Sequence, residues 1–124
     1  MIRNALILVA VLSSSALADD TCTQVFRQQR TCTDKYIPAL VDLRAKLDLP
    51  AGIKAKVASH RDDVIAQAKE EWKHDSTDAA IEQTCKKIPA NAPVADAKAC
   101  LAKSGCDAFV ACIIPVTEKM FLHK

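Results

Sequence analysis

Six cysteines are the residues of this sequence whose type and spacing could support chemistry: Cys22, Cys32, Cys85, Cys100, Cys106 and Cys112. Thiol redox centres commonly use a C-x-x-C pair with a lowered thiol pKa, and zinc sites use ligand pairs two to four residues apart. No C-x-x-C occurs, and five residues separate each of the last three cysteines from the next. An even number of cysteines in a small exported domain instead predicts disulfides, here three of them.

Two histidines, His60 and His74, are weaker candidates for binding a metal ion. They are 14 positions apart, and the sequence has no i,i+4 histidine pair of the kind that holds zinc on a helix. His60 falls on the same helical face as Val57 and Val64, so we expect it to be a partly buried histidine with a hydrogen-bond partner. A metal-handling protein is therefore only an alternative, and we predict no cofactor.

Serine and glycine patterns give no sign of catalysis. Neither Ser59 nor Ser76 stands in a G-x-S-x-G nucleophile elbow, and the chain has only two glycines, too few for a phosphate-binding loop. The sequence therefore predicts a protein that is not an enzyme.

Trp72 is the candidate for a partner-binding surface. It is the only tryptophan and stands among charged residues in "AKEEWKHD", near the expected end of a helix. Such a residue is often a core aromatic at the edge of a domain, but tryptophan is also enriched among the residues that dominate protein interfaces. Both interpretations remain open at the level of sequence.

The first eighteen residues have the three parts of a secretory signal peptide. Arg3 supplies the positive charge, an apolar run follows, and a small-x-small site ends at Ala18. The apolar run is shorter than the about 20 residues that a membrane-spanning helix needs. We expect a signal peptide over residues 1–18, one mature domain over 19–124, periplasmic or extracellular localisation, and no stable membrane anchor.

Composition favours an all-α fold. Aromatic residues make up 4% of the chain, and alanine is abundant, which suits closely packed helices better than a β-sandwich. Loss of Arg3 with the leader changes 17 basic residues to 16, against 15 acidic residues. A charge so nearly balanced does not support binding to nucleic acid.

Helix signals divide the mature chain into four or five helices. The first is expected to start near Cys22, where Thr21 and Gln24 fit a capping box, and to end or kink at Pro38. Its inward stripe consists of Cys22, Val25, Gln29, Cys32 and Tyr36.

A long amphipathic helix is expected over residues 53–74, with a buried stripe of Ile53, Val57, Val64, Ala68 and Trp72. Further helices are expected to begin at a cap on Asp75 or Ser76, at Val94, and at Cys106, with Gly105 ending the helix that starts at Val94. We predict a compact helical bundle braced by disulfides.

Helix geometry restricts how the cysteines pair. Cys22 and Cys32 are ten positions apart, about 15 Å along a helix, whereas bridged Cα atoms lie within about 7 Å. Cys106 and Cys112 share a helix and are excluded for the same reason. A helical hairpin around Gly105 favours Cys100–Cys112, which leaves Cys22 and Cys32 to pair with Cys85 and Cys106. Of the two arrangements we favour Cys32–Cys85 with Cys22–Cys106.

The chain resembles small exported helical proteins of Gram-negative bacteria that have no established function. The residues that carry the resemblance are Cys22, Cys32, Trp72, Cys85 and the C-x5-C run from Cys100 to Cys112. The resemblance covers most of the mature chain and implies no activity. Insect odorant-binding proteins and the twin C-x9-C proteins of mitochondria do not fit, because their cysteine spacings differ.

These features favour a secreted or periplasmic binding protein without enzymatic activity, such as an inhibitor, an immunity-like protein or an envelope-stress partner. Its partner is expected to be another protein. A carrier of a small apolar ligand between the helices is an alternative, because apolar residues form long seams.

Overall fold

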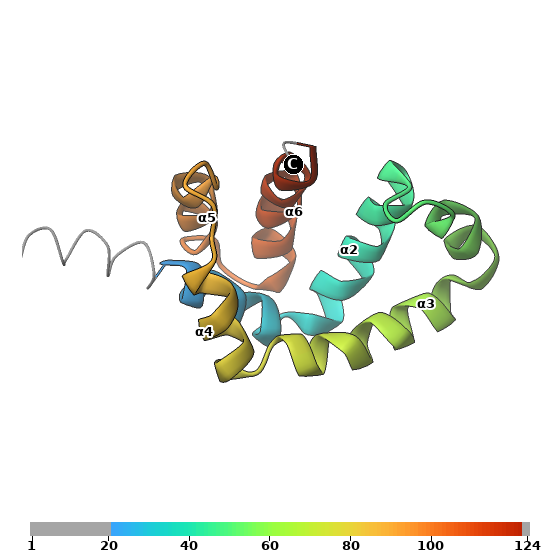
Figure 1. Ribbon diagram of the computed structural model, residues 1–124, viewed down its shortest axis with the longest axis horizontal. Coiled ribbons are helices and arrows are strands. Elements are labelled where there is room, and N and C mark those ends of the chain that lie inside the picture. The colour runs from blue at the N-terminus through green and yellow to red at the C-terminus, as the bar shows by residue number, and fades with distance from the viewer. Residues whose placement is uncertain (1–20, 123–124) are drawn as a thin grey trace, which may run out of the picture.

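Helices account for the secondary structure of residues 21–122, the part of the chain that the computed structural model describes, and no strand occurs in this range. The first described helix covers residues 21–31, and the chain is helical from Thr21, the first described residue. It is followed by α2 (Thr33–Leu47), α3 (Ile53–Asp75), α4 (Asp78–Lys86), α5 (Val94–Cys100) and α6 (Cys106–Leu122) (Figure 1). The predicted all-α class is confirmed, and the expected signal peptide over residues 1–18 lies outside the described residues.

The chain has one helix more than expected because the predicted first helix is interrupted at Cys32. This residue has non-helical torsions, φ −98° and ψ 23°, whereas α2 continues through Pro38. A proline inside a helix removes one backbone hydrogen bond and crowds the carbonyl four residues before it. The break at Cys32 lies six residues before the proline, and α2 then continues through Pro38 as a helix.

Helices α2 and α3 lie side by side and are joined by a tight turn (Figure 1). Asp48 has a positive φ of 50°, and its carboxylate Oδ1 accepts hydrogen bonds from the backbone N–H groups of Gly52 at 3.1 Å and Lys54 at 3.0 Å. Gly52 itself offers no side-chain cap. Asp48, four residues before Gly52, therefore provides the side-chain cap of α3 and fixes where α3 begins.

Replacing Asp48 with alanine is expected to lower the free energy of unfolding by about 1 to 2 kcal/mol, the usual cost of losing a helix cap. Asparagine at this position keeps a side-chain acceptor and tolerates positive φ, so Asp48→Asn is expected to remain close to the wild type. Urea denaturation of both variants measures the difference. If the free energy of unfolding falls equally in Asp48→Ala and Asp48→Asn, the side-chain cap contributes little.

The predicted stripe of α3 is confirmed, with one exception. Val57 and Val64 are buried, while Ile53, Ala68 and Trp72 are half-buried and contact the main core. His60, predicted to be partly buried on this face, is exposed. Its torsions of φ −139° and ψ 43° break the helical geometry, and this local kink turns its side chain away from the stripe.

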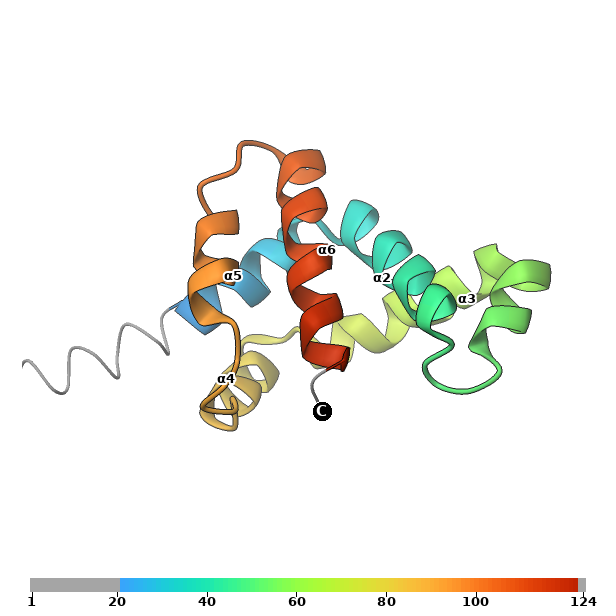
Figure 2. The same ribbon diagram turned by 90° about the horizontal axis from the view of Figure 1, so that it is seen from above.

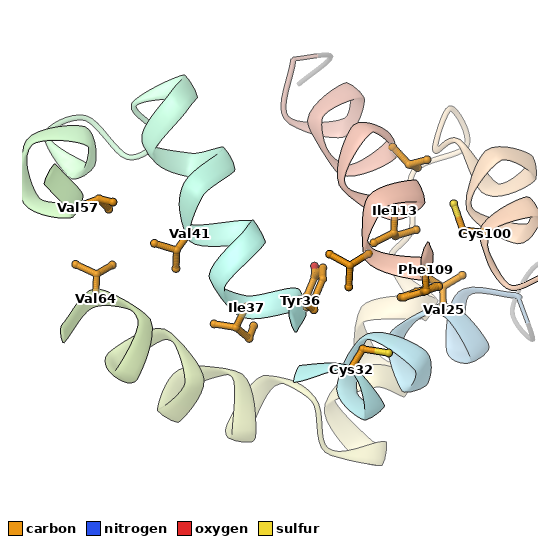
Figure 3. Close-up of a cluster of buried hydrophobic side chains, with 12 residues drawn as sticks. Val25, Cys32, Tyr36, Ile37, Val41, Val57, Val64, Cys100, Phe109 and Ile113 are labelled. Atoms are coloured by element: carbon orange, nitrogen blue, oxygen red, sulfur yellow. The ribbon is translucent and has the colours of Figure 1, made fainter. Parts of the chain in front are cut away.

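The main hydrophobic core runs from the kink of α3 across α2 to α6 and α5 (Figure 3). Its buried members are Val25, Cys32, Tyr36, Ile37, Val41, Val57, Val64, Cys100, Phe109, Val110, Ile113 and Val116. A smaller cluster joins Cys22 to Ile81 and Cys85 of α4. All five residues of the inward stripe predicted for the first helix are buried, Gln29 among them.

Two predicted helix boundaries were wrong. Thr77, not Asp75 or Ser76, caps α4, because its Oγ1 accepts a hydrogen bond from the Ala80 N–H at 3.1 Å. Helix α5 ends at Cys100, well before Gly105, whose φ of 82° belongs to the turn that leads into α6. Figure 2 shows α5 and α6 side by side, with helix 21–31 crossing beneath them.

Candidate functional site

Three disulfides join all six cysteines. They are Cys22–Cys85, Cys32–Cys106 and Cys100–Cys112, with Cα–Cα distances of 5.8, 5.4 and 5.5 Å. No free cysteine remains among the described residues. The cysteines therefore brace the fold, as their spacing predicted, and the oxidised state is consistent with an exported protein. None of the helices within residues 21–122 is both long and apolar enough to span a bilayer.

The predicted pairing was right for Cys100–Cys112 and wrong for the other two bridges, whose partners are exchanged. The reason is the antiparallel course of the chain. Helix α3 runs back along α2 and ends beside Thr33, to which the Trp72 indole donates a hydrogen bond. The next helix, α4, therefore meets Arg30 at its start and Cys22 at its end. Cys32 therefore forms its disulfide with Cys106, the first residue of α6.

Trp72 lies beside a solvent-open hollow of about 410 Å³. The indole is half-buried, its Nε1–H donates to Thr33 Oγ1 at 3.1 Å, and its ring centroid lies 5.6 Å from that of Tyr36 at an angle of 54°. These contacts hold the ring in one orientation. Trp72 is thus both a core aromatic at the edge of the domain and part of the wall of a surface hollow.

Tyr36, which lies behind Trp72, is 5% exposed. Burial raises the pKa of its phenol to about 12, because the phenolate would be poorly solvated there. Tyr36 is therefore neutral under physiological conditions, and it serves as an apolar support for the indole.

Three cations line the hollow, and each of them is paired with a carboxylate. Arg30, Lys69 and Lys73 line it together with a single carboxylate, that of Asp34. Lys69 pairs with Asp34 at 3.0 Å and Lys73 with Glu70 at 2.8 Å. These pairs are exposed to solvent, so each contributes little to stability.

The arginine of this group is held more firmly than the lysines. Arg30 Nη1 donates to the Ser76 carbonyl and to Asp78 Oδ1, both at 2.9 Å. The Arg30 hydrogen bond and charge lower the pKa of Asp78, and the hydrogen bond from Lys73 lowers the pKa of Glu70. Asp78 and Glu70 thus stay ionised at neutral pH. Arg30 also fastens the α3–α4 turn to helix 21–31.

The two histidines proposed as weak metal ligands are not brought together. Both are exposed and lie on α3, His60 at its kink and His74 near its end. Among the described residues, no group of three or more histidine, cysteine, aspartate or glutamate side chains is placed to hold a metal ion. The structure therefore gives the metal-handling alternative no supporting site.

A second pocket, of about 70 Å³, lies between helix 21–31, the α4–α5 loop, α5 and α6. Apolar groups line most of it, including Val25, Val94, Ala97 and Ile113, and no charged side chain lines it among the described residues. Gln29 also lines this pocket, and its buried Oε1 has no hydrogen-bond partner among the described residues. The helical pattern predicted Gln29 on the inward stripe, but nothing in the sequence indicates the pocket beside it.

Comparison of the chain with protein-family models, with curated proteins and with solved structures found no match.

Proposed function

We propose that this protein is an exported binding protein without enzymatic activity, which holds a partner protein at the Trp72 hollow. The observation that carries the proposal is a fixed tryptophan in a hollow of about 410 Å³ bordered by three cations. Such a protein would act in the periplasm or outside the cell as an inhibitor, an immunity-like protein or an envelope-stress partner. It would need no cofactor, nucleic acid or membrane anchor.

The rigidity of Trp72 supports this use. Aromatic anchors in pockets dominate the energy of many protein interfaces. Because Trp72 is already held by Thr33 and Tyr36, little side-chain entropy is lost when a partner covers it. The volume of the hollow falls within the range typical of binding pockets, about 300 to 1,000 Å³. It can accept one or two side chains of a partner.

The charges define what the partner would present. Three cations and one carboxylate line the hollow, which favours a segment carrying aspartate or glutamate next to an apolar side chain. The apolar side chain would pack on the indole, and the carboxylate would displace Asp34 or Glu70 from its lysine. Electrostatic complementarity of this kind mainly sets association rate and specificity.

The test is capture of binding proteins from the exported fraction of the native host, with binding then measured by calorimetry. The charge reversal Lys73→Glu is expected to weaken binding about tenfold or more, because it places like charge opposite the partner carboxylate. Lys86→Glu is the matched control, since Lys86 is also an exposed helical lysine paired with a nearby glutamate, but lies on α4 outside the hollow. We expect it to change the affinity less than twofold.

A second variant tests the contribution of the indole separately from the contribution of charge. Trp72→Ala is expected to abolish detectable binding, while circular dichroism reports whether the helices are kept. If no exported protein is captured, or if Lys73→Glu and Lys86→Glu behave alike, the proposed site is wrong.

A further inference from the structure

We propose that the Gln29 pocket binds a small neutral aliphatic molecule whose hydroxyl group donates a hydrogen bond to Gln29 Oε1. This pocket shares no lining residue with the Trp72 hollow. The proposal is therefore independent of protein binding at Trp72. It provides a specific binding site for the alternative function, that of a carrier of a small apolar ligand.

The Oε1 atom of Gln29, which has no hydrogen-bond partner among the described residues, determines the polar group of the ligand. Gln29 is 5% exposed, and its Oε1 has no hydrogen-bond partner among the described residues. A buried acceptor without a donor is unfavourable, and a ligand hydroxyl that reaches it removes this penalty. The terminal torsion of a glutamine side chain is soft, so Oε1 can turn toward the pocket that the same side chain lines.

The walls determine the rest of the molecule. Val25, Val94, Ala97, Ile113 and Val116 offer hydrocarbon surface, and the described residues place no charge in the wall. A charged ligand would lose its hydration without gaining a partner there. The body of the ligand is therefore aliphatic and neutral.

The volume limits how much of the ligand is enclosed. About 70 Å³ is available, less than the roughly 150 Å³ of a cavity that holds benzene. Only the hydroxyl end and a few carbon atoms fit inside. The remaining chain would lie over Met120, a residue of the same pocket that is 42% exposed.

Titration of the disulfide-bonded protein with 1-hexanol, followed by ¹H–¹⁵N NMR spectra, tests the inference. Saturable shifts are expected at Val25, Ala97 and Ile113. Hexyl methyl ether has a similar chain but no donor, and it is expected to bind at least about fivefold more weakly, because Oε1 stays unpaired. Hexanoate, which is anionic at neutral pH, is expected not to bind.

Two variants identify the amide as the group that recognises the hydroxyl. In Gln29→Leu the preference for hexanol over the ether is expected to disappear, and the urea midpoint is expected to rise, because an unpaired buried acceptor has been removed. Gln24→Leu, an exposed position on the same helix outside the pocket, is expected to keep the preference.

Three results would overturn the proposal. They are shifts that do not saturate with hexanol, equal affinity for hexanol and the ether in the wild type, and a preference that persists in Gln29→Leu. A lowered urea midpoint in Gln29→Leu would also contradict it, since that result would mean that Gln29 already has a partner inside the protein.

Discussion

Replacement of both Cys32 and Cys106 by alanine is expected to lower the free energy of unfolding by about 4 kcal/mol. The bridge closes a loop with a sequence separation of 74 residues, and in the chain-entropy model loops of this length contribute about that much. A small domain has a total stability of about 5 to 15 kcal/mol. The double variant should therefore retain its fold only marginally, as measured by chemical denaturation without reductant.

The Cys22–Cys85 bridge provides a matched control, because its sequence separation of 63 residues gives a similar entropic term. The two bridges differ in what they join. Cys32 belongs to the main core, whereas Cys22 and Cys85 belong to the small cluster with Ile81. We therefore expect the Cys22→Ala, Cys85→Ala double variant to release α4 locally while the main core persists.

Native-state hydrogen exchange distinguishes these outcomes, since local and global openings have different free energies. Loss of the Cys22–Cys85 bridge is expected to reduce protection mainly in α4, residues 78–86. Loss of the Cys32–Cys106 bridge is expected to reduce it throughout α2 and α6. Uniform loss of protection in both variants would show that α4 is an integral part of the main cooperative unit.

Local sequence signals predicted the helices well because helix formation depends mainly on residues that are close together in the chain. The helix expected over residues 53–74 is found as Ile53–Asp75, and its apolar spacing identified which side faces the core. The stripe from Cys22 to Tyr36 was also correct, although the chain bends at Cys32. The 3.6-residue period of buried positions continues across such a bend when the residues on both sides of it face the same core.

The cysteine pairing required information about distant segments. Spacing along the chain identified Cys100–Cys112, whose partners are separated by 12 residues. It did not show that α3 returns to the start of α2, a contact fixed by Trp72 and Thr33. Once that return is known, the antiparallel course of α4 places Cys85 beside Cys22. The exposure of His60 was missed for a related reason, because nothing in the local pattern signals a kink at that residue.

The candidate sites depend on tertiary structure even more than the cysteine pairing does. Sequence showed Trp72 among charged residues, but the hollow also needs Arg30 and Asp34 from other helices. Gln29 was visible as a polar residue on a buried stripe. Whether its Oε1 finds a hydrogen-bond partner depends on the segments packed around it, and within residues 21–122 it has none.

Phe109→Ala is expected to reduce the free energy of unfolding by about 3 to 5 kcal/mol, the range observed when a buried phenylalanine is truncated. Phe109 is fully buried, with 0% exposure, and lies in the main core near Val25, Cys100 and Ile113 (Figure 3). Its position near the start of α6 places it next to Cys106, so the cavity would form where the Cys32–Cys106 bridge enters the core. Neighbouring side chains fixed by this bridge have little freedom to collapse into the space.

Phe121→Ala is the control for this prediction, because it makes the same change near the other end of α6. Phe121 is half-buried, and the Arg44 guanidinium carbon lies 5.1 Å from its ring centroid. An exposed cation–π contact contributes about 0.5 to 1 kcal/mol, so we expect a total loss of about 1 to 2 kcal/mol. Denaturation followed by the fluorescence of Trp72, the only tryptophan, measures both variants in the same way. Equal losses would mean that the space around Phe109 closes after truncation, and that the bridge beside it does not hold the core rigid.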